Sequence, residues 1–466
     1  PIEIIADGKD KSRVTVQLKD ASGHDVNDDS REITIMGLKV DTAQATAMTH
    51  KGNGLYEGFI TSRKSGVDTV GYRIKDLGEG QDKKTLTYVA GEYDLIESLL
   101  TIDPATIKAD GIAEAKVTVQ LRDANKNNIL VNDAVVELRE LKLGKLKDGG
   151  LVLNKVGNGR YEGTIVSIVS GTEIVGFTID SKSAKNEHPI TYTAGDADLS
   201  QSEISANPVE IEANNRDVST ITVQLKDRHG NNVEKNSGTV VLRDYIYGKP
   251  VEAELRYQGN GRYEGDIRSN KAGRDTISFS LDGKDAPKGI NTTVTYVAGG
   301  ADAKYSTISA SPAIITADGK ERSQLTVQLR DGEGNSLTNG INQETGVEYV
   351  IKLVAKDSSN TIIGDIDNAI MSDHKNGQFI TYVSSTIAGI DHFSFTIEGR
   401  KADSSTTVTY NAGKADPSAS IIRATPESIE VSTGDIVSTL TVELRDANNN
   451  IVTTGVDTVK IISKDN

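Results

Sequence analysis

Acidic side chains that recur at fixed places in this sequence are its main candidates for metal chemistry. Asp94, Asp198, Asp302 and Asp416 each lie three residues after an Ala-Gly pair, at spacings of 104, 104 and 114 residues. Carboxylates are the oxygen ligands that calcium prefers. A cation there would tie neighbouring modules together, so these four aspartates are candidate calcium ligands. A carboxylate that accepts backbone N–H groups at a turn explains the same placement without a metal.

Two other segments present oxygen donors at alternate positions, as a calcium-binding loop does. A loop of roughly twelve residues needs Gly at its sixth position and a bidentate carboxylate at its last, and in the second copy these positions hold Asn128 and Ala134. Asp and Asn are also the residues that a hairpin turn after a strand favours. The spacing therefore favours a turn. The donors are Asp123, Asn125 and Asn127, and Asp446, Asn448 and Asn450.

Little in the sequence points to catalysis. The six histidines do not recur at equivalent positions, and no His-x-x-x-His or His-Glu-x-x-His spacing occurs. The absence of cysteine excludes thiol nucleophiles, thiolate metal sites and disulfides. A Ser-His-Asp triad is assembled only by folding, but no Gly-x-Ser-x-Gly elbow supports one. We predict that the chain is not an enzyme and needs no cofactor, calcium being the one candidate.

The candidate residues belong to a repeat of about 100 residues. Val-Thr-Val-Gln-Leu-Lys-Asp, which ends at Asp20, recurs in related form with closing aspartates at 123, 227, 331 and 446. Gly-Asn-Gly-x-Tyr-Glu-Gly and Thr-Tyr-x-Ala-Gly follow in the same order, and the fourth copy has the first of these motifs in the degraded form Lys-Asn-Gly-Gln-Phe, which ends at Phe379. We predict immunoglobulin-like domains at 1–96, 97–200, 201–304 and 305–418, the fourth with a loop insertion, and an incomplete domain at 419–466.

The repeat has the pattern of an all-β domain. Apolar residues at 14, 16 and 18 alternate with polar ones, which is the period of a half-buried strand. About seven such strands per repeat, separated by turns, predict an antiparallel immunoglobulin-like sandwich. The Asn-Gly pairs predict tight hairpin turns, and the aromatic residue two positions later is expected in the core. The fold prediction is tandem sandwiches in an elongated rod, each about 40 Å long.

The charge of the chain excludes some partners. The 466 residues include 52 Lys and Arg against 67 Asp and Glu, a net charge of −15. Such a field repels the phosphates of nucleic acids and anionic membrane surfaces, so we predict no nucleic-acid partner. No run approaches 18 apolar residues, and we expect any targeting signal or membrane anchor to lie outside this segment.

The repeats resemble the group 1 bacterial immunoglobulin-like domains that are tandem in the intimin and invasin family of adhesins. The resemblance rests on Pro-x-x-Ile-x-Ala-Asp-Gly, on the Val-Thr-Val-Gln-Leu-Lys-Asp strand with its Asp-Ala-x-Gly/Asn-Asn turn, and on the closing Tyr-Val-Ala-Gly-x-x-Asp. It implies an outer-membrane inverse autotransporter with a β-barrel, an extracellular stalk and often a lectin-like tip. The segment then corresponds to the stalk, at the bacterial cell surface and anchored in the outer membrane through a region outside it.

Three hypotheses about function follow. The favoured one is a monomeric extracellular stalk that projects an adhesive tip toward host cells or other surfaces. In the alternative, the repeats themselves bind a host protein or glycan through the insertion at 340–372, since Asp331 to Phe379 spans 48 residues against 36 to 38 in the first three repeats. No Arg-Gly-Asp occurs to suggest integrin binding. The third hypothesis is an array that spaces a surface enzyme elsewhere in a longer chain.

Overall fold

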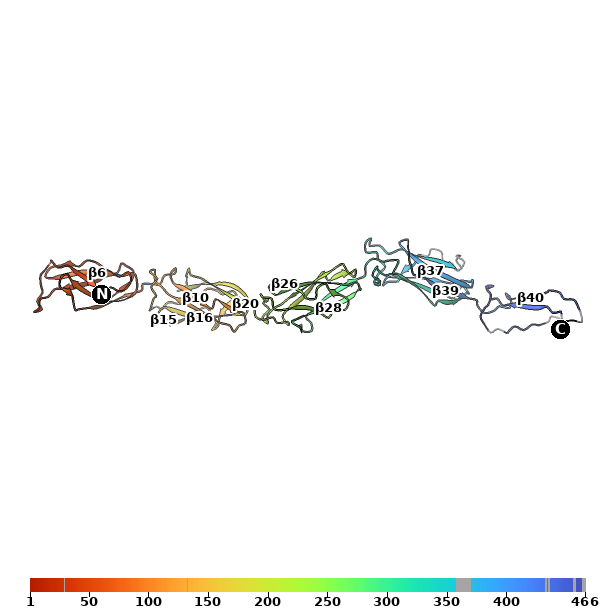
Figure 1. Ribbon diagram of the computed structural model, residues 1–466, viewed down its shortest axis with the longest axis horizontal. Coiled ribbons are helices and arrows are strands. Elements are labelled where there is room, and N and C mark those ends of the chain that lie inside the picture. Colours follow the sequence, from red (N-terminus) through yellow and green to blue (C-terminus); the bar gives the residue numbers. More distant parts are fainter. Residues whose placement is uncertain are drawn as a thin grey trace. The chain divides into compact units, whose positions relative to one another are not determined.

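The computed structural model describes residues 1–28, 30–131, 133–357, 370–431, 434, 436–455 and 458–462. Their regular elements are all β-strands (Figure 1), and within these ranges there is no helix long and apolar enough to cross a membrane. The chain divides into two compact units. The first is Pro1–Ser202, Leu225–Ser237 and Gly259–Gly261, and the second is Glu203–Gln224, Gly238–Gln258 and Arg262–Asn466.

The first repeat, in the first unit, is built from two sheets. One has the order β2-β6-β4, with β5 also on β6, and the other has the order β1-β9-β7-β3, with β8 on β7. Buried Ile4, Ile60 and Tyr88 form part of the core. The strands are β1 (Glu3–Ile5), β2 (Ser12–Gln17), β3 (Ile33–Met36), β4 (Gln44–Ala45), β5 (Thr49–His50), β6 (Leu55–Thr61), β7 (Gly66–Ile74), β8 (Gly78–Glu79) and β9 (Lys84–Val89).

The second repeat, also in the first unit, shows why the repeated strand alternates. In β12 the side chains of Val117 and Val119 are fully buried, while the alternating polar residues Lys116, Thr118 and Gln120 lie on the other face. Pro104 lies between β10 and β11, where the chain passes from one sheet to another. The strands are β10 (Leu99–Asp103), β11 (Thr106–Lys108), β12 (Ala115–Gln120), β13 (Val136–Leu138), β14 (Gly144–Leu146), β15 (Asn154–Gly157), β16 (Arg160–Ser167), β17 (Gly171–Val175), β18 (Phe177–Ile179), β19 (Lys182–Ser183) and β20 (His188–Thr193).

The strands of the third repeat, in the second unit, form two sheets. One sheet contains β21-β23-β27-β25, and the other contains β22-β30-β28-β24 with β29 on β28. Its first strand again divides, so that β21 is antiparallel to β23 and β22 is parallel to β30. The strands are β21 (Glu203–Asn207), β22 (Glu210–Glu212), β23 (Ser219–Gln224), β24 (Val240–Arg243), β25 (Lys249–Pro250), β26 (Arg256–Gly259), β27 (Arg262–Arg268), β28 (Gly273–Leu281), β29 (Lys284–Asp285) and β30 (Thr292–Val297).

The fourth repeat has the same two sheets, β31-β33-β36-β35 and β32-β39-β37-β34, with β38 on β37. Phe379, Phe393 and Phe395 are buried in its core. Part of the predicted insertion at 340–372, namely 358–369, lies outside the described residues. The strands are β31 (Thr307–Ser311), β32 (Ile314–Thr316), β33 (Ser323–Gln328), β34 (Ile351–Asp357), β35 (Ser372–Asp373), β36 (Gln378–Val383), β37 (Gly389–Ile397), β38 (Arg400–Lys401) and β39 (Thr406–Asn411).

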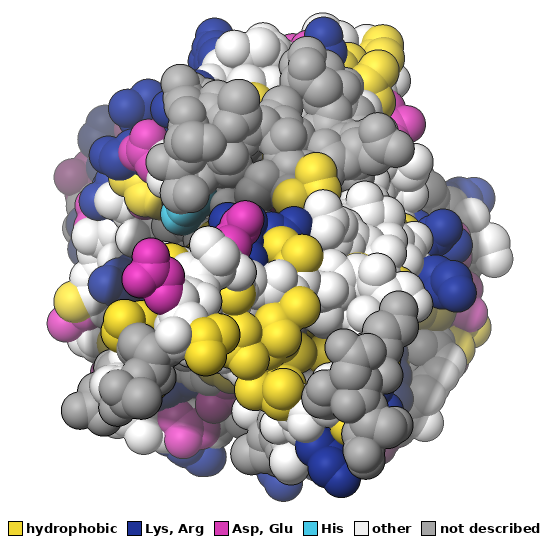
Figure 2. Space-filling model, turned by 90° about the vertical axis from the view of Figure 1, so that its right-hand side faces the viewer, with side chains coloured by type: hydrophobic (Ala, Val, Ile, Leu, Met, Phe, Trp, Pro, Cys, Tyr) yellow, Lys and Arg dark blue, Asp and Glu magenta, His cyan; other side chains and the backbone are white. Residues whose placement is uncertain are grey.

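The segment after residue 418 contains one described strand pair, β40 (Ile421–Thr425) and β41 (Thr439–Glu443). Half a sandwich leaves apolar side chains uncovered, and Ile422 is 57% exposed and Leu440 is 44% exposed. Figure 2 shows hydrophobic side chains gathered on one face of the molecule.

The predicted turns and core aromatics are confirmed. All four Asn-Gly pairs have positive φ at both residues, from 48° to 70°, which is the geometry of a tight hairpin turn. The aromatic residue two positions later is buried in each case, with at most 2% exposed. Packing therefore accounts for Tyr56, Tyr161, Tyr263 and Phe379. The prediction of an all-β chain of tandem sandwiches is confirmed as well.

Candidate functional site: the joints between repeats

The side chains with the most distinctive arrangement lie where one repeat meets the next. We number the joints from first to fourth, each between one repeat and its successor. At the first joint, Oδ1 of Asp123 accepts the N–H groups of Asn125 and Asn127, both at 2.9 Å, and closes the turn after β12. Its Oδ2 accepts the N–H of Gly91, at 3.0 Å, in the linker from the first repeat. One carboxylate therefore holds both the turn and the linker.

Asn127 carries the contact into the preceding repeat. Its Oδ1 accepts the N–H of Ser65 at 2.8 Å, and its Nδ2 donates to the carbonyl of Arg63 at 2.9 Å and to Oδ2 of Asp123 at 2.9 Å. Ser65 and Arg63 lie in the turn between β6 and β7 of the first repeat. Both polar atoms of a buried amide are thus satisfied by a different repeat.

The second joint, in the first unit, has the same arrangement. Oδ2 of Asp227 accepts the N–H of Gly195 at 2.8 Å. Oδ1 of Asn231 accepts the N–H of Ser170 at 2.8 Å, and Nδ2 donates to the carbonyl of Ile168 at 2.9 Å. The corresponding atoms at these two joints therefore bind the same positions of the preceding repeat.

The joints of the second unit repeat it again. At the third joint Asp331 binds Gly299, and Asn335 binds Ala272 and the carbonyl of Asn270, at 3.0, 2.8 and 3.2 Å. At the fourth joint Asp446 binds Gly413, and Asn450 binds Ala388 and the carbonyl of Thr386, at 2.8, 2.8 and 2.9 Å. We call these pairs the Asp–Asn clasps: Asp123 and Asn127, Asp227 and Asn231, Asp331 and Asn335, and Asp446 and Asn450.

The clasp aspartates are buried, with 1% to 3% of each residue exposed. Burial raises the pKa of Asp227, but hydrogen bonds from Asn231, from the N–H of Gly195 and from the turn outweigh it and hold this pKa below the ordinary value. The pKa of Asp446 is lowered in the same way, against burial, by Asn450 and Gly413. These two carboxylates therefore remain ionised at neutral pH and accept hydrogen bonds as charged groups.

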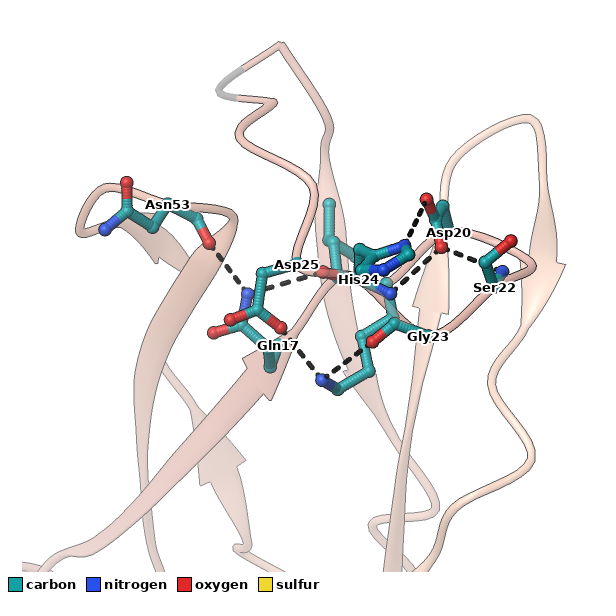
Figure 3. Close-up of polar contacts among 9 residues, drawn as sticks. Gln17, Asp20, Ser22, Gly23, His24, Asp25 and Asn53 are labelled. Atoms are coloured by element: carbon teal, nitrogen blue, oxygen red, sulfur yellow. Dashed lines mark hydrogen bonds and ion pairs between the residues drawn. The ribbon is translucent and has the colours of Figure 1, made fainter.

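The first repeat shows which clasp residue makes the turn. Here Asp20 is followed four residues later by His24 instead of Asn (Figure 3). Oδ1 of Asp20 still accepts the N–H groups of Ser22 and His24, at 2.8 and 2.9 Å, and the backbone hydrogen bond from His24 lowers the pKa of Asp20. The turn therefore forms without the amide, whose hydrogen bonds in the other four turns reach the neighbouring repeat.

The predicted metal candidates lie close to the clasps but cap turns. Oδ1 of Asp94 accepts the N–H groups of Ile96 and Glu97 at 2.7 and 3.0 Å. Asp198, Asp302 and Asp416 likewise accept the N–H two residues later, at 2.7 to 2.8 Å. In the described part of the chain there is no group of three or more histidine or acidic side chains that could hold a metal ion. These bonds are the ones that the turn interpretation predicts, and the four aspartates stay candidate calcium ligands only.

The interpretation of the Asp-x-Asn-x-Asn segments as turns agrees with the structure. The binding of the preceding repeat by the amides of Asn127 and Asn450 was not predicted from the sequence. The signal was present in the sequence: Asn follows the closing Asp by four residues at 127, 231, 335 and 450, but His24 stands there in the first repeat. If the turn alone required the amide, the first copy would need Asn at position 24 as well. The amide is present only in the copies that follow another repeat in this sequence.

Tandem immunoglobulin-like repeats with built joints define the class of this protein. It belongs to the invasin domain 3 family, whose model matches residues 1–91, 94–195, 198–299 and 302–413. The family consists of adhesin repeats and is not enzymatic.

Several relatives are known adhesins. The inverse autotransporter adhesin YeeJ of Escherichia coli K12 is 22% identical over an alignment of 407 residues, and the match covers 81% of this chain and 17% of that protein. The chain thus spans about a sixth of the length of this relative, whose likeness implies a location at the bacterial cell surface.

Solved structures of similar proteins include invasin, described as a bacterial integrin-binding protein. It is 17% identical, with 90% of this chain and 78% of that chain covered and a TM-score of 0.40. The Escherichia coli adhesin FdeC is 18% identical, with 70% and 100% covered and a TM-score of 0.42. Yersinia pseudotuberculosis InvD is 19% identical, with 67% and 97% covered and a TM-score of 0.42.

Proposed function

We propose that the chain is an extracellular stalk segment of a bacterial surface adhesin, a stiff array of repeats that projects a distal adhesive tip. The observation that carries this proposal is the Asp–Asn clasp, which recurs at all four joints with the same partners. A chain that needed only flexible spacing between domains would have no use for buried, directed hydrogen bonds at each joint. Repeated contacts between neighbours are instead how a repeat array limits bending.

The energetics of the clasp suit a stiff joint. A typical intramolecular hydrogen bond contributes about 0.5–1.5 kcal/mol net, and a bond to a charged group contributes more. Each clasp makes three hydrogen bonds to the preceding repeat and its linker. Together these favour one arrangement of neighbours by a few kcal/mol, roughly enough to make bent states a minor population.

The remaining parts of the proposal rest on the relatives. We infer domain boundaries at 1–96, 97–200, 201–304, 305–418 and 419–466, and anchoring in the outer membrane through a region outside this segment. Host receptors are the partner class, because invasin is described as integrin-binding. On this proposal the receptor contact belongs to the tip, and the stalk segment is monomeric.

Small-angle X-ray scattering of the purified chain tests the proposal. Four stiffly joined repeats should give a maximum dimension of roughly 150 Å or more. Replacing Asn127, Asn231, Asn335 and Asn450 by Ala should shorten the mean dimension, because the joints then bend. His24→Ala is the matched control, since His24 makes no clasp. A compact wild-type particle would contradict the stalk function.

A second candidate function is binding of a host protein or glycan by the insertion at 340–372. It is favoured by a groove of about 560 Å³ that Asn342, Gln343 and Glu344 of the insertion line together with Glu212 and Arg400. Shortening 340–349 to the length of the other repeats tests it. Loss of host-cell binding by the purified chain would favour this candidate, and unchanged binding would remove it.

A further inference from the structure

The third joint lacks a contact that the other three joints possess. At the first and fourth joints a second amide of the turn donates to the preceding repeat: Asn125 to the carbonyl of Ala6, and Asn448 to the carbonyl of Ala317, at 3.2 and 2.9 Å. At the second joint Arg228 donates to the carbonyl of Asp110 at 2.8 Å. The corresponding positions of the third joint hold Gly332 and Glu333. Among the described residues, neither provides a side-chain hydrogen bond to the third repeat.

The fourth repeat also contains extra residues close to this joint. The N–H of Glu398 donates to the carbonyl of Val350, which lies 19 residues after Asp331. In the first three repeats the corresponding acceptor lies 12 residues after the closing aspartate. Seven inserted residues therefore precede Val350. The corresponding bonds are Lys75 to Glu32, Asp180 to Val135 and Asp282 to Thr239.

The inserted residues form a small hairpin at 340–349. The N–H of Tyr349 donates to the carbonyl of Gly340, and the N–H of Asn342 donates to the carbonyl of Val347, both at 2.8 Å. Gln343, near the tip, lines an open surface pocket of about 550 Å³ together with Glu210 and Arg216 of the third repeat. The hairpin of the fourth repeat thus reaches across the joint to the neighbouring repeat.

Tyr349 fixes the linker at the base of this hairpin. Its side chain is buried in the core of the fourth repeat, with 6% exposed, and packs near Ala301 of the linker. Its hydroxyl oxygen accepts the N–H of Ala301 at 2.9 Å. The N–H of Gly299 is held by Asp331 and that of Asp302 by the carbonyl of Arg330. The fourth repeat therefore holds the linker N–H groups at residues 299, 301 and 302.

The first joint has a tyrosine in an equivalent role, supplied by a different part of the chain. Tyr93 and Ala301 both lie immediately before the turn-capping aspartate of their linkers. The hydroxyl of Tyr93 donates to Oδ2 of Asp180 at 2.9 Å, in the following repeat. Asp180 corresponds in register to Glu398, which lines the groove with Tyr349. At the third joint the linker has only a methyl group at this position, and the insertion supplies the tyrosine instead.

We propose that the insertion in the fourth repeat is a brace for the third joint, in which Tyr349 ties the linker to the fourth repeat and replaces the turn contact that Gly332 and Glu333 cannot make. This inference rests on the proposed stalk function. It assigns the described part of the insertion to the control of joint stiffness, so that the insertion need not be a receptor-binding loop.

Distance distributions between pairs of spin labels on the full chain test the proposal. The chain has no cysteine, so two introduced cysteines are the only labelled sites. Thr276→Cys with His392→Cys reports on the third joint, and Thr69→Cys with Ile174→Cys reports on the first joint; these are exposed, register-equivalent positions of β28, β37, β7 and β17. Tyr349→Phe removes only the hydroxyl. It should broaden the distribution at the third joint and leave the first unchanged.

Tyr93→Phe is the mirror-image control and should broaden the first joint alone. Thermal unfolding of each variant, followed by calorimetry, shows whether the fourth repeat is still folded. If it is not, a chain with the hairpin 340–349 shortened by seven residues replaces Tyr349→Phe in the same measurement. A third-joint distribution that keeps its width in the folded variant, or that broadens together with the first joint, overturns the brace. A failed stalk function would show instead as a compact wild-type particle in scattering, with the width at the third joint still responsive to Tyr349.

Discussion

Asn127 and Asp123 form one hydrogen-bonded unit that serves two repeats at once. Nδ2 of Asn127 donates to Oδ2 of Asp123 at 2.9 Å, and the same carboxylate oxygen accepts the N–H of Gly91 from the linker. The amide oxygen accepts the N–H of Ser65 from the first repeat. A change at either side chain therefore affects the turn, the linker and the neighbouring repeat to different degrees, which allows their contributions to be separated.

Asn127→Ala should loosen the first joint without unfolding the second repeat. The substitution removes the bonds to Ser65 and Arg63 and leaves their polar groups without this partner, a loss of about 1–3 kcal/mol in the preference for the aligned joint. The turn should persist, because Asp20 forms the same turn without an amide. The measurement is the width of the distance distribution between labels at residues 69 and 174.

The matched variant is Asn127→His, which places the residue of the first repeat at the second. It should loosen the joint as Asn127→Ala does, because an imidazole cannot present the same acceptor and NH₂ donor in one plane. A joint that kept its wild-type width in both variants would mean that the amide adds nothing to stiffness.

The lowered pKa of Asp227 predicts that the stability contributed by the second clasp depends on pH. The folded-state pKa of Asp227 lies below its ordinary value of 3.8, because hydrogen bonds outweigh burial. The unfolded chain then binds more protons near this pH, so the stabilisation by Asp227 is fully present above the ordinary pKa and is lost as the pH falls through the lowered one. We expect Asp227→Asn to lower stability at neutral pH and to reduce the loss below about pH 4.

Calorimetric unfolding of the wild type and Asp227→Asn over a series of pH values checks this. The difference between the two proteins should shrink as the pH falls. Parallel curves would show that Asp227 titrates alike in the folded and unfolded chain. Asp217→Asn, at an exposed aspartate of the same repeat, serves as the control for the loss of one negative charge.

Most of the fold could be predicted from the sequence because its signals are local. The alternation of apolar and polar residues in Val14–Gln17 predicts which side chains are buried. An Asn-Gly pair such as Asn53-Gly54 predicts a tight turn because both residues readily adopt positive φ. The clasp could not be predicted in this way, since the partners of Asn127 lie 62 and 64 residues earlier in another repeat. An asparagine in a turn is already explained by hydrogen bonds to its own turn, so the sequence gives no reason to expect a partner in another repeat.

The same limit applies to Tyr349. An aromatic residue in a loop insertion is usually interpreted as a contact for a partner, and the length of the insertion alone favoured that hypothesis. Only the folded chain shows that the hairpin turns back, so that the tyrosine is buried against its own linker.

The hairpin turns predict a graded effect of adding one methyl group. A Cβ at Gly159 would lie 2.1 Å from the carbonyl oxygen of Ile129, and φ there is 62°. A Cβ at Gly157 meets no atom within 4 Å, although φ is also positive. Gly157→Ala should therefore lower the free energy of unfolding by about 1–2 kcal/mol, because alanine is strained at a positive φ. Gly159→Ala should cost more, because the β-turn must also move away from Ile129.

Calorimetry of the second repeat's unfolding transition in the full chain measures both variants. Tyr161→Phe identifies that transition, because it removes the bond from this hydroxyl to the carbonyl of Ala134 inside the same repeat. If both glycine variants lowered the stability of the second repeat equally, the turn could move away from Ile129 without loss of stability, and the prediction would be wrong.

Calcium is predicted to have no effect on the dimensions of the chain. The carboxylates of Asp94, Asp198, Asp302 and Asp416 already accept backbone N–H groups, and a cation would have to displace these bonds. Scattering with calcium and with a chelator should therefore give the same maximum dimension. Bending on chelation would instead make these aspartates metal ligands. Asp198→Asn and Asp302→Asn would then identify the joint concerned, because an amide still accepts the N–H groups at the turn but binds calcium more weakly than a carboxylate.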